Sequence, residues 1–390
     1  MQSDDSHEPL HPLARSTNAG ARETSWLAAA LLVVISTLSA LLAAEVVLRF
    51  VLGPPVHFVH PQESYAFDPE IGHRLVPGDR AFTHAEPVEI NSAGLRGPEY
   101  APSPPIGTTR ILALGDSQTF GNGLPRDATW PYLLEATLER AHPGVRFEVI
   151  NGGVSGTDTW QHARLLERWS VQYRPDAVVL AVYVNDVVRR HEPAAPELTN
   201  SWKHRIAYVM KRSAVVSFGW SWGRRIASSG EGAERELRLI RGEPDPELAA
   251  SWAEVASSLA QMGRFCDERG IPFWIAVLPR RDQVSGVLRD TAFNRRVVDL
   301  ASAAGIQAVD LLEPLQRAFR ARGSALFIPW DGHNSRLANE VVARQLTGIL
   351  GPRLANTAGA ARPALNRGAH RYANRETLAS AKVRPAPGAP

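Results

Sequence analysis

A serine, a histidine and an aspartate in this chain could together carry out nucleophilic chemistry. Ser117 follows the apolar run "RILALGD", and Asp331 and His333 stand two residues apart in "PWDGHNS". A serine hydroxyl is a poor nucleophile until a base removes its proton, and that base needs a third group to orient it. His333 could take the proton from Ser117. In an extended loop residues two apart point the same way, so Asp331 could hold the other ring nitrogen of His333. These residues therefore predict a catalytic triad.

Three groups could stabilise the oxyanion that forms when an ester carbonyl is attacked. Ser117 is expected to begin a helix, where its own backbone N–H is free to donate. Gly153, in "NGGVSG", offers a backbone N–H with no side chain in the way, and Asn185, in "YVNDV", offers its carboxamide. We expect Ser117, Gly153 and Asn185 to form an oxyanion hole.

An alternation of strands and helices must position these groups. Short apolar runs predict strands over 109–115, 145–151, 176–184, 272–278 and 307–312. Helical periodicity predicts helices over 128–142, 159–173, 246–269, 293–304 and 336–350. This order predicts a flavodoxin-like three-layer α/β/α domain with a five-stranded parallel sheet. Residues that follow the strands then meet beyond their carboxyl ends.

Four short blocks resemble the conserved blocks of the SGNH, or GDSL-type, hydrolase family. They are "GDSQTFG", "NGGVSG", "YVNDV" and "DGHNS", in that order, and the resemblance covers about residues 108–350. It implies that Ser117 is the nucleophile, Gly153 and Asn185 are oxyanion donors, His333 is the base and Asp331 is its partner. The segments "DPEIGHRLVPG" and "INSAGLRGPEY" are also similar to the lead-in of membrane-anchored bacterial members.

The triad loop departs from the family's commoner pattern, which has Asp three residues before His. Trp330 occupies that position here, and Asp331 stands two residues before His333. A branch of the family has the closer spacing, so we keep Asp331. The α/β-hydrolase alternative fits less well, because its Gly-x-Ser-x-Gly elbow would need glycine at Thr119.

An apolar segment near the N-terminus predicts a membrane anchor. Residues 26–44 carry no charge and would span roughly 28 Å as a helix, close to the roughly 30 Å of a bilayer core. We expect an uncleaved transmembrane helix over 26–48, in preference to a signal peptide or a buried helix. Arg15 and Arg22 precede the span and Arg49 follows it, which weakly favours a cytoplasmic tail over 1–25 and a periplasmic body at a bacterial inner membrane.

The rest of the chain divides by composition. We expect an irregular lead-in over 53–107, the hydrolase domain over 108–351 with a helical insertion at about 190–246, and a disordered basic tail over 352–390. Within the insertion, residues 201–226 hold six Lys or Arg, five aromatic residues and no acidic residue. This stretch is interpreted as a helical excursion packed on the domain, with a lid or a surface on anionic lipid as the alternatives.

Composition excludes several other site types. With 43 basic and 40 acidic residues the net charge is +3, and no nucleic-acid partner is expected. A single cysteine excludes an internal disulfide and a cysteine-based zinc cluster. No metal is assigned to Asp331 and His333, because two ligands on one loop are too few. His162 is expected on a helix surface, and Asp116 and Asp186 are expected to fix their turns.

The resemblance implies ester hydrolysis through an acyl-serine intermediate, without a metal or organic cofactor. Acetyl or other short acyl groups on glycans are one possible substrate, with lipid or small esters still open. An O-acyltransferase is the first alternative, because a sugar hydroxyl can replace water in the second half-reaction, and it would work with a partner protein of an acylation pathway. The second alternative is a non-catalytic envelope scaffold or carbohydrate-binding module.

Overall fold

The computed structural model describes residues 19–187, 202–227 and 231–357. Residues 1–18 of the predicted N-terminal tail, the start of the predicted insertion and residues 358–390 of the predicted basic tail lie outside these residues. The described ends of both tails differ from the prediction: residues 19–25 and 352–357 are helical.

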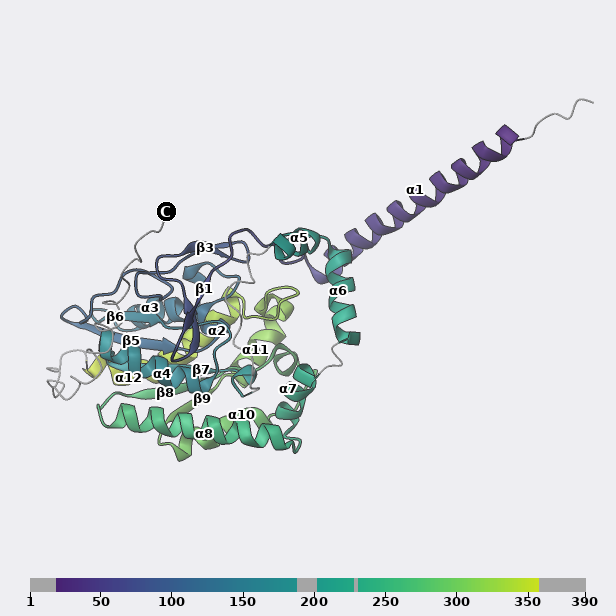
Figure 1. Cartoon of the computed structure of the whole chain (residues 1–390). Helices are drawn as coiled ribbons and strands as arrows, with labels where there is room; N and C mark the ends of the chain where they lie inside the picture. The colour runs from purple at the N-terminus through teal and green to yellow at the C-terminus, as the bar shows by residue number, and fades with distance from the viewer. Residues whose placement is uncertain (1–18, 188–201, 228–230, 358–390) are drawn as a thin grey trace, which may run out of the picture.

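A five-stranded parallel sheet forms the centre of the molecule (Figure 1). Its strands are β5 (Thr108–Leu114), β6 (Arg146–Asn151), β7 (Ala177–Val182), β8 (Phe273–Val277) and β9 (Gln307–Asp310). Their order across the sheet is β6-β5-β7-β8-β9, which confirms the flavodoxin-like arrangement. Strands β5, β7 and β8 are buried along their whole length. Burial on both faces explains why they read as continuous apolar runs rather than as alternating patterns.

Helices cover both faces of the sheet. One face packs against α3 (Trp130–Ala141), α11 (Leu312–Arg322) and α12 (Arg336–Thr357), and the other against α4 (Thr159–Tyr173), α8 (Pro246–Asp267) and α10 (Ala292–Ala303). Along β5, Ile111 and Ala113 point to the face covered by α3, α11 and α12. Leu112 and Leu114 point to the face covered by α4, α8 and α10, as the two-residue period of a strand requires. The lone Cys266 is buried in α8. The predicted three layers are confirmed.

The lead-in was expected to be irregular but contains two antiparallel hairpins. The first pairs β1 (Tyr65–Asp68) with β2 (Gly72–Leu75), and the second pairs β3 (Arg80–Thr83) with β4 (Glu86–Glu89). Arg168 on α4 holds the first hairpin through Asp68 at 2.9 Å. Arg96, after the second hairpin, is buried and donates to the carbonyls of Phe120 and Gly121 at 2.7 and 2.8 Å. The lead-in is thereby fixed to the sheet's carboxyl edge.

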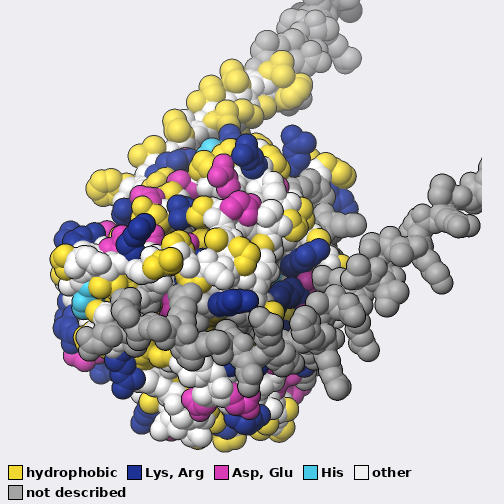
Figure 2. Space-filling view, turned by 90° about the vertical axis from the view of Figure 1, so that its left-hand side faces the viewer, with side chains coloured by type: hydrophobic (Ala, Val, Ile, Leu, Met, Phe, Trp, Pro, Cys, Tyr) yellow, Lys and Arg dark blue, Asp and Glu magenta, His cyan; other side chains and the backbone are white. Residues whose placement is uncertain are grey.

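A long helix, α1 (Ala19–Leu52), precedes the body. Its part from Trp26 to Leu52 has a mean hydropathy of 2.5, is not buried, and is long and apolar enough to cross a membrane. Figure 2 shows hydrophobic side chains covering the part of α1 that projects from the body. This helix is a candidate membrane anchor.

The described part of the insertion is helical. It comprises α5 (Trp202–Met210), α6 (Ala214–Ala227) and α7 (Glu231–Arg241). Helices α5 and α6 lie at the end of α1 nearest to the body (Figure 1). The remaining short elements are α2 (Ser117–Phe120), α9 (Arg281–Val284), η1 (Arg126–Ala128), η2 (Val184–Asp186) and η3 (Gly323–Leu326).

Candidate active site

Ser117 is the first residue of α2, directly beyond the carboxyl end of β5. The Asp116 carboxylate caps this helix by accepting from the backbone N–H of Gln118 at 2.9 Å. Gly115 makes the sharp exit from the strand with φ +147°. A Cβ at Gly115 would lie only 2.2 Å from Oγ1 of Thr119, so the position requires glycine. The strand therefore ends where the Ser117 hydroxyl stands at the head of a helix.

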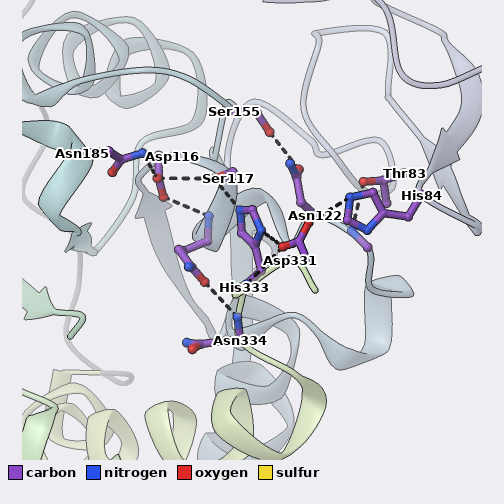
Figure 3. Close-up of polar contacts among 12 residues, drawn as sticks. Thr83, His84, Asp116, Ser117, Asn122, Ser155, Asn185, Asp331, His333 and Asn334 are labelled. Atoms are coloured by element: carbon purple, nitrogen blue, oxygen red, sulfur yellow. Dashed lines mark hydrogen bonds and ion pairs between the residues drawn. The ribbon is translucent and has the colours of Figure 1, made fainter. Parts of the chain in front are cut away.

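The structure brings Ser117, His333 and Asp331 together (Figure 3). Nε2 of His333 lies 2.9 Å from Oγ of Ser117. On the other side of the ring, Nδ1 of His333 contacts Oδ1 of Asp331. With Asp331 ionised, Nδ1–H donates to the carboxylate and Nε2 is free to accept the serine proton. The three side chains form one hydrogen-bonded series.

Electrostatics favour this protonation pattern. Burial alone would raise the pKa of Asp331, but hydrogen bonding and charge from His333 hold it below its ordinary value. Burial alone would lower the pKa of His333, but the Asp331 carboxylate raises it above the ordinary value of imidazole. Asp331 is thus a carboxylate that stabilises a proton on His333, as a base in proton transfer requires.

The loop that carries Asp331 and His333 is a turn, so the expectation of an extended loop was wrong. The backbone N–H groups of Asp331 and Gly332 both donate to the carbonyl of Ile328, at 3.3 and 3.2 Å. Trp330 and Gly332 adopt φ values of +66° and +93°. The Asp331 carboxylate folds back and also accepts the backbone N–H of His333 at 3.1 Å. The closer spacing works because this turn brings the carboxylate onto both N–H groups of His333.

A second histidine, which the sequence did not single out, contacts the same carboxylate. Nε2 of His84 lies 3.3 Å from Oδ2 of Asp331, and these side chains are only 13% and 16% exposed. Burial lowers the pKa of His84, although the Asp331 charge opposes this effect. Nδ1 of His84 is buried without a hydrogen-bond partner. The Nε2 side of the His84 ring therefore faces the Asp331 carboxylate, whereas its Nδ1 side has no hydrogen-bond partner.

The lead-in holds His84 in a strained conformation. His84 has φ +54°, in the left-handed region that most side chains avoid. The Gln62 side chain hydrogen-bonds both backbone groups of His84: it accepts from the N–H at 2.9 Å and donates to the carbonyl at 2.8 Å. The Phe58 ring packs edge-on against the imidazole at 4.8 Å, and Gly123 leaves no room there for a Cβ, which would lie 2.2 Å from Nδ1. Nothing in periodicity or spacing marks His84, because its partner is distant in sequence.

Two of the three predicted oxyanion donors have protein acceptors in this structure. The Gly153 N–H donates to Oδ1 of Asn151 at 3.0 Å, and Nδ2 of Asn185 donates to Oδ2 of Asp116 at 2.8 Å (Figure 3). A Cβ on Gly153 would lie 2.3 Å from the backbone nitrogen of Phe120. Gly153 is thus packed against α2, and Asn185 reaches Asp116, which caps that helix.

The neighbouring polar residues have structural partners. Oδ2 of Asp186, in η2, accepts the N–H of Tyr183, the residue just before η2, at 2.6 Å, and burial raises the pKa of Asp186 well above its ordinary value. His162 is fully buried and pairs with Oγ1 of Thr157 at 2.9 Å, so its expected place on a helix surface was wrong. Burial lowers the pKa of His162 to about 3, which keeps it neutral.

A cleft of about 210 Å³ borders the triad loop. Its walls include Pro54, Pro55, His84, Gly123 and Ile328. The lead-in therefore shapes the surroundings of Asp331 as well as supplying His84. Among the described residues, no group of three or more His, Cys, Asp or Glu side chains is placed to hold a metal ion.

Comparison with known proteins identifies the family. A sequence model of the GDSL-like lipase/acylhydrolase family matches residues 113–333. An arylesterase from Vibrio mimicus is 36% identical over 108 residues, which is 27% of this chain and 52% of that protein, so the match spans about half of its length. The structures of TesA and of the acetyl xylan esterase AlAXEase align at 16% and 15% identity with TM-scores of 0.39 and 0.40. They cover 63% and 62% of this chain, and each alignment includes 99% of the other chain.

The family match begins inside β5, ahead of Ser117, and ends at His333. It takes in more than half of the 390 residues and contains both ends of the hydrogen bond between the serine and the imidazole. The chain belongs to the GDSL-like lipase/acylhydrolase family.

Proposed function

We propose that this protein is a serine esterase that hydrolyses acyl esters through an acyl-serine intermediate. The observation that carries the proposal is the hydrogen-bonded series from Ser117 through His333 to Asp331. Oγ of Ser117 attacks the acyl carbon while His333 takes its proton. His333 then gives that proton to the departing alcohol, and a water activated by His333 releases the acid.

The oxyanion donors in this proposal are the N–H groups of Ser117 and Gly153 and the amide of Asn185. Asn151 and Asp116 now accept from the last two, and these contacts fix where the donors lie before substrate arrives. A developing oxyanion is a stronger acceptor than the neutral amide oxygen of Asn151, so the Gly153 N–H donates to the oxyanion as it forms.

His84 acts as a positioning residue. Its Nε2 lies 3.3 Å from Oδ2 of Asp331 while Nδ1 of His333 contacts Oδ1, and we propose that neutral His84 donates a hydrogen bond from Nε2 to the carboxylate. The carboxylate, held at both oxygens, cannot rotate away from His333 as proton transfer proceeds. His84 thereby supports an acid that stands two residues before His333, where the commoner family pattern has the acid three residues before it, at the position of Trp330.

The proposed setting is a membrane surface, with α1 as the anchor and the catalytic domain on the periplasmic side of a bacterial inner membrane. The apolar stretch of α1 supports the anchor, and the arginines on either side of it weakly favour the orientation. Acylated glycans, acetylated ones above all, are the proposed substrates, since such polymers are found outside the cytoplasm.

The test is hydrolysis of p-nitrophenyl acetate by the full-length protein in detergent, with mass spectrometry after a serine-reactive phosphonate. Ser117→Ala should lower kcat by about 10⁴- to 10⁶-fold and abolish the adduct. Ser285→Ala, which changes a serine in the loop after α9, should leave both intact. Activity and labelling that persist in Ser117→Ala would overturn the proposal.

The acyl acceptor is tested in the same preparation. Release of acetate from acetylated xylan supports a glycan esterase. Acyl transfer to an added polysaccharide that outruns hydrolysis would instead establish the acyltransferase alternative, with the same serine.

A further inference from the structure

Hydrogen bonds join the C-terminal part of α1 to the N-terminus of α6. The Glu45 carboxylate on α1 accepts the backbone N–H groups of Ala214 and Val215 at 2.9 and 3.0 Å, and the Ser213 hydroxyl at 2.8 Å. Arg49 adds a hydrogen bond to the carbonyl of Arg212 at 2.7 Å. A carboxylate at a helix N-terminus is favourable, so α6 is held just where the uncharged stretch 26–44 of α1 ends.

Large apolar side chains are exposed on α5 and α6. Outside α1, eleven large hydrophobic residues are exposed among the described residues, and seven of these fall within residues 202–222. They are Trp202, Ile206, Val209, Met210, Phe218, Trp220 and Trp222, which we call the α5–α6 surface. On α5 they recur at helical spacing along one side. Such clustering marks an interaction site rather than scattered surface residues.

The charged residues of the segment that carries this surface are all of one sign. Lys203, Arg205 and Arg212 are exposed, and the sequence has no acidic residue between 201 and 226. The Lys211 ammonium lies 5.4 Å from the Trp220 ring. Tryptophan beside lysine and arginine is typical of the membrane interface, where the rings lie among headgroups and the cations meet lipid phosphates.

We propose that the α5–α6 surface lies on the bilayer that α1 crosses and binds its anionic lipid headgroups. The proposal rests on the proposed anchor: because Glu45 and Arg49 join α6 to the end of the apolar stretch, the neighbouring α5–α6 surface meets the headgroups of the leaflet where that stretch ends. Docking at two places fixes the orientation of the catalytic domain, which a single helix would leave free to rotate.

Three fluorophore positions test the proposal in the full-length protein reconstituted into vesicles. In a Cys266→Ser background, an environment-sensitive dye is attached at Ile206→Cys on the α5–α6 surface, at Leu38→Cys in α1, or at Val171→Cys, which is 66% exposed on α4. Nitroxide lipids should quench the dye at 38 and at 206 but not at 171, and aqueous iodide should show the reverse order. Esterase activity is recorded in each sample.

The outcomes separate the surface from the anchor and from the chemistry. If 38 is quenched while 206 behaves like 171, the anchor holds and the α5–α6 surface proposal fails. If 38 is not quenched, the anchor fails, and the surface proposal with it. Hydrolysis by the reconstituted protein reports on the esterase proposal in either case.

Lipid charge supplies the second test. Each basic residue near an anionic surface contributes about fivefold to binding. In vesicles with phosphatidylglycerol, the double substitution Lys203→Gln and Arg205→Gln should therefore lower the ratio of docked to undocked protein, as reported by the dye at position 206, by roughly 25-fold. Equal quenching of 206 in anionic and zwitterionic vesicles, unchanged by the two substitutions, would overturn anionic-lipid recognition.

Discussion

Replacing His84 should weaken catalysis by releasing one side of Asp331. Nε2 of His84 and Oδ2 of Asp331 are 3.3 Å apart, and both side chains are largely shielded from water. A hydrogen bond to a charged group contributes about 1.5–3 kcal/mol. Because about 1.4 kcal/mol corresponds to a tenfold change in rate, complete loss of the proposed hydrogen bond in the transition state lowers kcat by about 10- to 150-fold.

His84→Leu and His84→Gln form a matched pair for this measurement. Neither substitute is β-branched and both face the same φ of +54°, so their backbone strain is comparable. Only glutamine can donate from about the position of Nε2. We expect His84→Leu to show the full loss in kcat and His84→Gln to recover most of it.

The pH profile gives a readout that a purely structural role would not change. Without the His84 donor, more negative charge on Asp331 faces His333, which raises the pKa of His333 further. The base must be unprotonated, so the acid limb of kcat moves to higher pH in His84→Leu but not in His84→Gln. Equal losses in both variants with no shift of the limb would show that His84 serves only packing.

Three other perturbations follow from the same contacts. Since the Asp331 carboxylate raises the pKa of His333 against the effect of burial, the acid limb of kcat/KM should lie above pH 6.5; a limb at or below that pH contradicts the assignment. Gly153→Ala should lower the free energy of unfolding by about 1–3 kcal/mol, because its methyl would meet the backbone of α2. The control Gly348→Ala, which has open space on α12, should not destabilise the protein. Urea denaturation in detergent compares the two variants. Arg96→Met should lower the free energy of unfolding by about 1.5–3 kcal/mol and remove most of the activity, since it removes the donors to the carbonyls at the C-terminal end of α2. A melting temperature within a degree of the original would refute this.

The sheet and its order could be predicted because the strands are buried on both faces. Helix α4 begins and ends at the predicted residues, Thr159 and Tyr173, since one face of it has clear helical periodicity. The surface assignment of His162 was wrong although the helical spacing contains it: His162 lies four residues before the buried Leu166 and seven before the buried Trp169, on the same face of α4. The polar residue type, and not the periodicity, led to that prediction.

The meeting of Ser117, His333 and Asp331 could be predicted because parallel strands end at one edge. The turn conformation at Trp330 could not, since the Ile328 carbonyl and the side-chain contacts select it over an extended loop. His84 was missed for a related reason. A single histidine in a hairpin has no pattern of its own, and only the tertiary contacts of the lead-in bring it to the carboxylate.

Asp331 is held by segments that lie next to α1. Nε1 of Trp330 donates to the carbonyl of Gly53, directly after α1, at 3.1 Å. From the other side, Tyr208 on α5 stacks on Phe58 at 4.3 Å, and Phe58 packs against His84. A chain shortened past Gly53 would lose the first contact, and a displaced α5 would lose the second. The position of Asp331 therefore depends on the segments proposed to lie at the membrane, and activity measured on the full-length protein is the activity of the intact site.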